Sequence, residues 1–185
     1  ALKKACSLLE ENSVSLVMNG DTPFVDFETI KSALDTYKRR KSVFTIATST
    51  PTSPFGYGRI LRDNDKQILD IVEERDCNNE QRLIKEVNSG LYLISAEHLK
   101  KYISKIKKNK NSEYYLTDLV NIFVRDGLRV DSIPIKDERK FININTFDDY
   151  RKAHDLDRMF IYEECIKRDI FLADPNSFQK DLDVK

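Results

Sequence analysis

The sequence predicts an α/β fold in which a mixed sheet is followed by a long helix. Two short apolar segments, 14–18 and 42–48, alternate with helical patterns, which is typical of parallel strands covered by helices. Residues 58–62 and 68–73 flank a polar turn and predict a β-hairpin, which requires antiparallel pairing. A helical pattern rich in charge covers residues 147–167.

Composition restricts the class of protein and its partners. The chain has 185 residues, 40% hydrophobic and 34% charged, which is typical of a globular domain with a sizeable core. The 31 basic and 31 acidic residues give a net charge of zero, so we expect neither nucleic acid nor a membrane as a partner. The three cysteines are far apart, which favours free thiols and a cytoplasmic location over disulfides or a zinc site.

The start of the chain predicts a helix, a strand, a loop and a second helix. Residues 2–11 have one apolar helical face, and the apolar segment 14–18 predicts a buried strand. Residues 19–23 (NGDTP) form a predicted tight loop, after which Asp26 can cap a helix. Because ligands of α/β sheets bind beyond the carboxyl ends of strands, we expect this loop to lie at a ligand-binding edge.

The remaining elements continue the α/β pattern. Residues 87–94 predict a strand, which the sequence NSG at 88–90 interrupts. Residues 98–106 and 116–124 predict amphipathic helices, and residues 130–135 predict another strand.

Six segments that combine glycines, acids, amides and aromatic residues occur along the chain. They read MNGDTPFV (18–25), FGYGRI (55–60), IVEE (71–74), EVNSGLY (86–92), SEYYLTDL (112–119) and NINTFDDY (143–150). In this order and spacing they resemble the sugar-1-phosphate nucleotidyltransferases, from residue 1 to about residue 158. Within that family the chain is most similar to the uridyltransferase domains of bifunctional N-acetylglucosamine-1-phosphate uridyltransferases.

The resemblance implies a fold and a reaction. Residues 1–155 would form a partial Rossmann-like (GT-A-like) nucleotidyltransferase domain. Residues 156–185 would form a linker helix and the start of a left-handed β-helix domain, because IFLADP at 170–175 resembles that junction. A uridylyl group would pass from UTP to N-acetylglucosamine 1-phosphate, giving UDP-N-acetylglucosamine for peptidoglycan synthesis, and pyrophosphate. A transferase for another sugar, and a non-catalytic sugar-nucleotide-binding or interaction module, remain open as alternatives.

The resemblance also implies a catalytic Mg²⁺ held by Asp21 and Asn145. Mg²⁺ prefers oxygen ligands and keeps substrate phosphates and waters in its shell, so few protein ligands are required. Asp and Asn also stabilise turns, which is the structural alternative for both residues.

The sugar is expected to contact Gly58, Glu73 and Asn88. Gly58 would let the sugar approach the backbone, although a glycine here also suits a bend. Glu73 would accept hydrogen bonds from sugar hydroxyls, unless it is only a solvated strand end. Asn88 offers a donor and an acceptor beside two small residues. Glu74 is expected to be an exposed surface charge.

Four further residues match substrate-binding positions of the family. Asn19 and Gly20 precede the expected metal ligand, and Asn19 stands where the bifunctional members usually have tyrosine, which leaves the nucleotide preference open. Tyr115 and Thr117 match positions in the pocket. Packing by Tyr115 and helix capping by Thr117 are equally good alternatives.

The family's phosphate loop and uracil contacts have no counterpart in this sequence. The family has a glycine-rich turn with an arginine and a lysine upstream of the position of Ala1, whereas none of the five glycines here forms such a turn. The chain is then a piece of a longer enzyme, an incomplete gene product or a binding remnant. We expect the 185 residues alone neither to bind UTP tightly nor to make a nucleotide sugar. We expect a bare sheet edge, completed by another copy or by the missing N-terminal segment.

Overall fold

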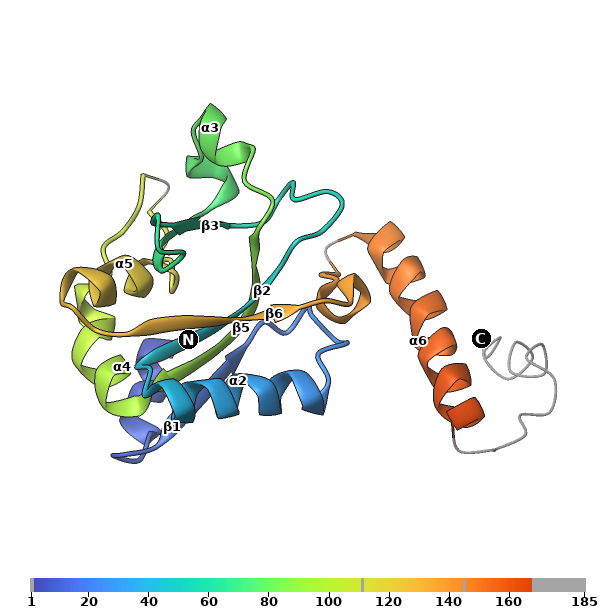
Figure 1. The fold of residues 1–185 in the computed structure, drawn as a ribbon, viewed down its shortest axis with the longest axis horizontal. Coiled ribbons are helices and arrows are strands. Elements are labelled where there is room, and N and C mark those ends of the chain that lie inside the picture. The colour runs from blue at the N-terminus through green and yellow to red at the C-terminus, as the bar shows by residue number, and fades with distance from the viewer. Residues whose placement is uncertain (1, 111, 145, 168–185) are drawn as a thin grey trace. The chain divides into compact units, whose positions relative to one another are not determined.

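A six-stranded mixed sheet organises the first part of the chain (Figure 1). A computed structural model describes residues 2–110, 112–144 and 146–167. These residues belong to two compact units, Ala1–Phe141 and Ile142–Lys185. The first unit carries every strand in the part of the chain that the structure describes, and the second unit carries α6 (Phe147–Lys167).

The strands of the first unit pair mostly in antiparallel fashion. They are β1 (Val14–Met18), β2 (Phe44–Ser49), β3 (Arg59–Arg62), β4 (Ile68–Val72), β5 (Val87–Ser95) and β6 (Val130–Ile135). The order is β4-β3-β5-β2-β6. Strand β1 pairs with β5 on the side opposite β2, which is the side on which β3 also pairs with β5. Only β2 and β6, among the described strands, pair in parallel. The sheet is therefore mixed, as predicted, and β3 and β4 form the predicted hairpin.

Strands β1 and β2 run in the same direction but do not pair with each other. Both are antiparallel to β5, which lies between them. The alternation of helices and strands predicted the shared direction correctly. It carried no information about the later strand that inserts between the two.

The helices cover both faces of the sheet. They are α1 (Leu2–Ala5), α2 (Phe27–Arg40), α3 (Asn79–Arg82), α4 (Ala96–Tyr102) and α5 (Asp118–Arg125), with short 3-10 helices η1 (Cys6–Leu8), η2 (Glu74–Asp76), η3 (Ile103–Lys105) and η4 (Glu138–Phe141). Asp26 caps α2 as predicted, because its carboxylate accepts a hydrogen bond from the Thr29 amide at 3.0 Å.

The first helical segment is shorter than predicted. It was expected over residues 2–11, but it ends at Leu8. The backbone becomes extended at Leu9, which has a ψ of 138° and ends the helical segment. Asn12 then takes a left-handed φ of 61°, which turns the backbone into β1.

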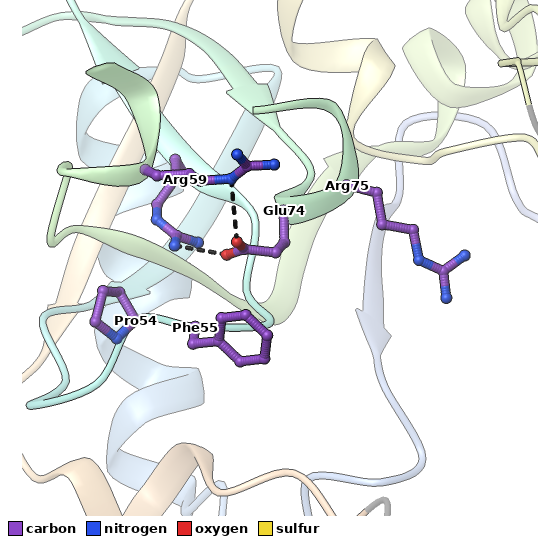
Figure 2. A pocket seen from close by; sticks show the side chains of 6 residues that line it. Pro54, Phe55, Arg59, Glu74 and Arg75 are labelled. Carbon is purple, nitrogen blue, oxygen red and sulfur yellow. Dashed lines mark hydrogen bonds and ion pairs between the residues drawn. The ribbon is translucent and has the colours of Figure 1, made fainter. Parts of the chain in front are cut away.

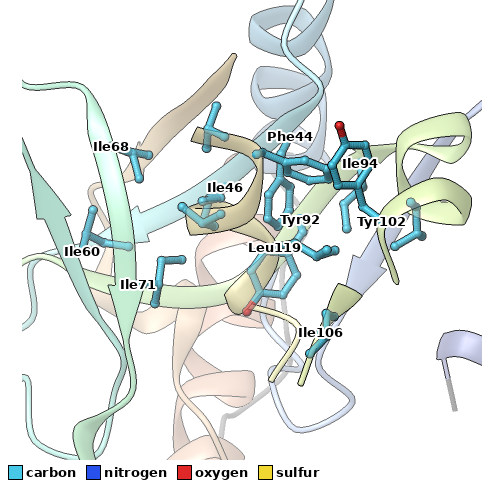
Figure 3. Close-up of a cluster of buried hydrophobic side chains, with 14 of the residues drawn as sticks. Phe44, Ile46, Ile60, Ile68, Ile71, Tyr92, Ile94, Tyr102, Ile106 and Leu119 are labelled. Atoms are coloured by element: carbon cyan, nitrogen blue, oxygen red, sulfur yellow. The ribbon is translucent and has the colours of Figure 1, made fainter. Parts of the chain in front are cut away.

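Two apolar cores lie on opposite faces of the sheet. Phe44 of β2 and Ile94 of β5 belong to the first core (Figure 3). The α5 residue Phe123 is part of the same core. On the same two strands, Ala47, which follows Ile46 of the first core, and Leu93 belong to the second core, which α2 covers. Alternate residues of a strand thus face opposite cores, and each fully buried large side chain stabilises the fold by about 2 kcal/mol.

The second unit begins its helix with a reciprocal cap. The Thr146 hydroxyl accepts a hydrogen bond from the Asp149 amide at 3.1 Å, and the Asp149 carboxylate accepts one from the Thr146 amide at 2.9 Å. The helix runs over Phe147–Lys167, which is the range the sequence predicted. The predicted junction at 170–175 lies outside the described residues. Across the described part of the chain, none of the helices combines the length and the apolar character that a membrane span requires.

Candidate active site

A bulge in β5 shapes the centre of the site. The β2–β5 register changes from Ile46 opposite Tyr92 to Thr48 opposite Asn88, so β5 has two extra residues there. Gly90 takes a φ of +79°, and the Ser89 hydroxyl donates to the Ala47 carbonyl at 2.7 Å. This is the interruption that the NSG sequence predicted, and such a bulge redirects the neighbouring side chains.

Three of the predicted sugar-binding residues meet beside this bulge. The backbone N–H of Asn88 donates to the backbone carbonyl of Gly58 at 2.9 Å. A Cβ atom on Gly58 would lie 3.2 Å from Glu73 Oε2 and 3.0 Å from Ile71 Cγ2. Gly58, Glu73 and Asn88 come from separate segments, so their meeting is a property of the fold. What they bind remains a prediction.

The Asn88 carboxamide is held at both ends. Its Oδ1 accepts a hydrogen bond from the Gly90 amide at 3.1 Å, and its Nδ2 donates to the Tyr92 hydroxyl oxygen at 2.7 Å. Sequence reasoning missed Tyr92. The available signal was its even spacing from Asn88, which puts the two on the same face of an extended strand.

Thr117 holds the Glu73 carboxylate. Its hydroxyl donates to Glu73 Oε1 at 2.8 Å, and the residue is only 3% exposed. Thr117 does occupy the N-cap position of α5, but its hydroxyl makes no capping hydrogen bond. The capping alternative therefore does not account for this hydroxyl. Burial raises the pKa of Glu73; the hydrogen bond from Thr117 opposes this rise, and the negative charge of Asp76 adds to it.

Tyr115 borders the same acidic region. Its hydroxyl donates to Glu113 at 3.4 Å. Burial raises the pKa of Tyr115, and the negative charges of Asp76, Glu113 and Glu73 raise it further. The side of the site formed by Glu73 and Asp76 therefore favours hydrogen-bond donors such as hydroxyl groups.

The loop after β1 is attached to the β5 bulge. The backbone N–H of Asn19 donates to the Gly90 carbonyl at 3.1 Å, and the Thr22 hydroxyl donates to the backbone carbonyl of Asn19 at 2.9 Å. A Cβ atom on Gly90 would lie 2.4 Å from Asn19 Nδ2, so the Asn19 side chain occupies the space above Gly90. A Cβ on Gly20 would meet nothing within 4 Å, and this structure gives no steric reason for a glycine there.

Asp21 carries a buried oxygen that lacks a partner. Its Oδ1 is buried and makes no hydrogen bond to the described protein. A buried carboxylate oxygen without a partner is unfavourable, so the position suits a cation or a hydrogen-bond donor from a ligand. The donor chemistry fits Mg²⁺, which prefers such oxygens. Asn145 lies outside the described residues, so the shared Asp21–Asn145 metal site remains a prediction.

Glu74 belongs to a separate pocket beside the site, and its predicted exposure is wrong. The pocket has a volume of about 550 Å³ and is lined by Pro54, Phe55, Arg59, Glu74, Arg75 and Arg82 (Figure 2). The Glu74 side chain is only 16% exposed, because it pairs with the buried Arg59 at 2.6 Å and accepts from the Gly56 amide at 3.2 Å. Adjacent carboxylates therefore have different surroundings: Glu73 faces Thr117, and Glu74 faces Arg59.

The class of this protein follows from its match to a known family. The model of the nucleotidyl transferase family matches residues 1–158. The chain therefore belongs to the nucleotidyl transferase family.

Within that family, the chain is similar to bifunctional proteins of bacteria. The bifunctional protein GlmU of Clostridium kluyveri is 35% identical over 179 residues, which cover 96% of this chain and 39% of that protein. The bifunctional protein GlmU of Streptococcus thermophilus is 33% identical over 172 residues, which cover 92% of this chain and 37% of that protein. The chain thus spans less than two fifths of the length of these relatives.

Solved structures share the fold. A glucose-1-phosphate thymidylyltransferase candidate from Bacillus anthracis superposes with a TM-score of 0.67 at 19% identity, covering 94% of this chain and 62% of that one. An apo UDP-glucose pyrophosphorylase superposes with a TM-score of 0.59 at 19% identity, covering 73% of this chain and 50% of that one. At these identities the comparison supports the fold alone.

Proposed function

We propose that this chain forms the sugar-binding part of a uridyltransferase that acts on UTP and N-acetylglucosamine 1-phosphate. The observation that carries the proposal is the meeting of Gly58, Glu73 and Asn88 beside the loop that contains Asp21. The similarity to the bifunctional GlmU proteins supports this choice of reaction and substrates. The products are UDP-N-acetylglucosamine and pyrophosphate.

The proposed sugar contacts follow from the free hydrogen-bonding capacity of each residue. Glu73 Oε1 accepts from Thr117, which leaves Oε2 to accept from a hydroxyl or amide N–H of the sugar. Asn88 Nδ2 donates one hydrogen to Tyr92 and retains a second for an acceptor on the sugar. Gly58 is proposed to let the sugar approach the backbone. A Cβ atom there would also crowd the Glu73 carboxylate, and Tyr115 lies at the edge of this acidic region.

The proposed metal ligands are Asp21 and Asn145, with Asn19 and Gly20 contributing the backbone of the adjoining loop. Mg²⁺, when bound, neutralises the phosphate charge that develops during transfer. The phosphate oxygen of the sugar 1-phosphate attacks the α-phosphorus of UTP, and the bond from that phosphorus to the pyrophosphate oxygen breaks. Asp21 and the sugar contacts supply orientation, which is the main contribution of protein groups in this kind of transfer.

Calorimetry with N-acetylglucosamine 1-phosphate tests the sugar site without requiring turnover. Asn88→Ala should weaken binding about tenfold, because a buried hydrogen bond to the ligand is lost. Asn121→Ala is the matched control, since the Asn121 carboxamide bonds to Asp70 outside the proposed site. Equal effects of the two substitutions, or unchanged affinity in Asn88→Ala, would remove the basis for the sugar site.

Pyrophosphate release tests the reaction itself. The assay uses the protein as the cell makes it, and its length is first measured from its intact mass. We expect N-acetylglucosamine 1-phosphate with UTP and Mg²⁺ to be preferred over glucose 1-phosphate or dTTP. Preference for another pair would reassign the substrates. Sugar-phosphate binding without any turnover would instead support a non-catalytic sugar-nucleotide-binding module.

A further inference from the structure

We infer that Tyr92 is a positioning residue, whose hydroxyl fixes the Asn88 carboxamide with an N–H directed at the sugar 1-phosphate. The inference rests on the proposed function, because it concerns how Asn88 presents its hydrogen bonds to that substrate. Its structural part, the fixed orientation of the carboxamide, can be measured without any ligand.

The orientation of the carboxamide follows from the chemistry of its neighbours. The Gly90 amide can only donate, so the Asn88 atom that faces it at 3.1 Å must be the oxygen. The nitrogen therefore faces the Tyr92 hydroxyl at 2.7 Å, whose oxygen accepts the hydrogen bond. One N–H and one oxygen lone pair of Asn88 remain for a ligand, and neither position can exchange with the other.

Tyr92 is itself held in place by packing. The residue is 4% exposed and belongs to the first apolar core, where its ring lies 5.6 Å from that of Phe44 (Figure 3). Burial raises the pKa of Tyr92 far above its ordinary value, and the hydrogen bond from Asn88 opposes this rise only in part. The hydroxyl therefore stays neutral and protonated at physiological pH, and its oxygen is a fixed acceptor on the core side of Asn88.

Removing this hydroxyl should disorder Asn88 while the core remains. Tyr92→Phe retains the ring and its packing but leaves Asn88 Nδ2 without its acceptor. The carboxamide then samples several rotations, and a site that is not preorganised loses affinity for its substrate.

The first experiment compares Tyr92→Phe with Tyr102→Phe by NMR. Tyr102 is another buried tyrosine of the same core, but its hydroxyl bonds to Asp126 rather than to a proposed site residue. We expect the Asn88 side-chain amide protons to exchange with solvent at least about tenfold faster in Tyr92→Phe, because one is no longer hydrogen-bonded. They should be unchanged in Tyr102→Phe. Unchanged Asn88 protons in Tyr92→Phe would overturn the inference.

The second experiment is a double-mutant cycle in the protein as the cell makes it. The measured quantity is the KM for the sugar 1-phosphate. We expect Tyr92→Phe to raise that KM about tenfold, with kcat and the KM for UTP nearly unchanged. In an Asn88→Ala background, Tyr92→Phe should have no further effect on KM, because it acts through Asn88.

The cycle separates the inference from the function on which it rests. Additive effects of the two substitutions, or equal losses in Tyr92→Phe and Tyr102→Phe, would assign Tyr92 a purely structural role. If Asn88→Ala alone changed neither affinity nor KM, the proposed sugar site would fail, whatever Tyr92 does to the carboxamide.

Discussion

One oxygen of the Asp21 carboxylate is buried and has no hydrogen-bond partner among the residues that the structure describes. Substitution of Asp21 can therefore separate effects on activity from effects on stability. We expect Asp21→Ala to lower turnover by at least about a hundredfold, since it removes the proposed metal ligand. The free energy of unfolding should change by less than about 1 kcal/mol, because the residue lies in a loop outside both cores. Steady-state assays and urea unfolding of the same preparations measure the two quantities. Parallel losses of both would show that Asp21 is a structural turn residue.

Glu73 makes a distinct pH dependence testable. A carboxyl whose pKa is higher in the folded state than its ordinary value of 4.5 binds more protons when folded over that interval. Its contribution to the free energy of unfolding therefore decreases as the pH rises above 4.5 through the folded pKa. The free energy of unfolding of Glu73→Gln, taken relative to wild type at the same pH, should therefore be higher at pH 8 than at pH 4. The variant should also bind the sugar phosphate less tightly.

Glu86 supplies the opposite control. Burial alone would raise the pKa of Glu86, but hydrogen bonds from Arg62 and Thr48 lower it overall. Its carboxylate therefore stabilises the fold above its ordinary pKa, and this contribution is lost as the pH falls through the folded value. The free energy of unfolding of Glu86→Gln, taken relative to wild type at the same pH, should be lower at pH 8 than at pH 4. Urea unfolding at both pH values measures each difference, and the same sign in both variants would contradict the surroundings described for Glu73.

At this scale, the sequence predicted the residues that meet but not the groups that hold them. The resemblance identified Gly58, Glu73 and Asn88, which the fold brings together. It could not reveal that Thr117 directs its hydroxyl at Glu73, because a threonine before a helix predicts a cap equally well. Tyr92 reads as an apolar strand residue, since its hydroxyl partner depends on the exact shape of the bulge.

At the scale of elements, the β5 bulge determines the geometry of the site. Gly90→Ala should destabilise the protein by about 1–3 kcal/mol, because Ala disfavours a φ of +79° and its Cβ would displace the Asn19 side chain. Gly127→Ala is the control: its φ is +71°, but a Cβ there would meet nothing within 4 Å. We expect chemical unfolding to show the smaller loss for Gly127→Ala, and calorimetry to show weaker sugar-phosphate binding only for Gly90→Ala. Equal behaviour of the two variants would mean that the Asn19 contact contributes nothing.

Element types were predictable where periodicity was long or apolar. Strands β1 and β6 and helix α6 have the ranges that the sequence predicted. The first helix was predicted too long, because apolar periodicity does not reveal the extended backbone at Leu9 that ends it. The position of the bulge was visible in the NSG sequence, but the number of extra residues depends on pairing with β2.

At the scale of the whole molecule, β1 presents an unpaired edge. Among the residues that the structure describes, β5 is the only strand that pairs with β1, and Leu16 of β1 is 44% exposed. Such an edge can pair with another chain. We expect the 185-residue chain to self-associate in sedimentation velocity as its concentration rises, and Leu16→Lys to reduce this association. Leu83→Lys makes the same chemical change at an exposed position outside the sheet, so it should have no such effect. A monomer at all concentrations, or equal effects of both lysines, would show that this edge does not mediate self-association.

The order of the strands was beyond the reach of sequence patterns. Residues in β1 and β5 are far apart in the chain, yet they pair, and β5 separates β1 from β2. Local periodicity predicts which residues form strands, whereas the pairing of distant strands depends on how whole faces pack. The family resemblance, rather than the periodicity, carried the information about which residues would share a site.

The peptide groups of Gly90 serve two neighbours at once: its N–H holds the Asn88 carboxamide, and its carbonyl holds the loop that leads to Asp21. A residue without a side chain thereby links the proposed sugar contact to the proposed metal ligand. During evolution, a substitution that reshapes the bulge for a different sugar would also move the aspartate, so the two properties would have to be inherited together. Redesign of the proposed sugar contact through Asn88 alone, with the Gly90 backbone retained, is therefore the route that leaves the proposed metal ligand undisturbed.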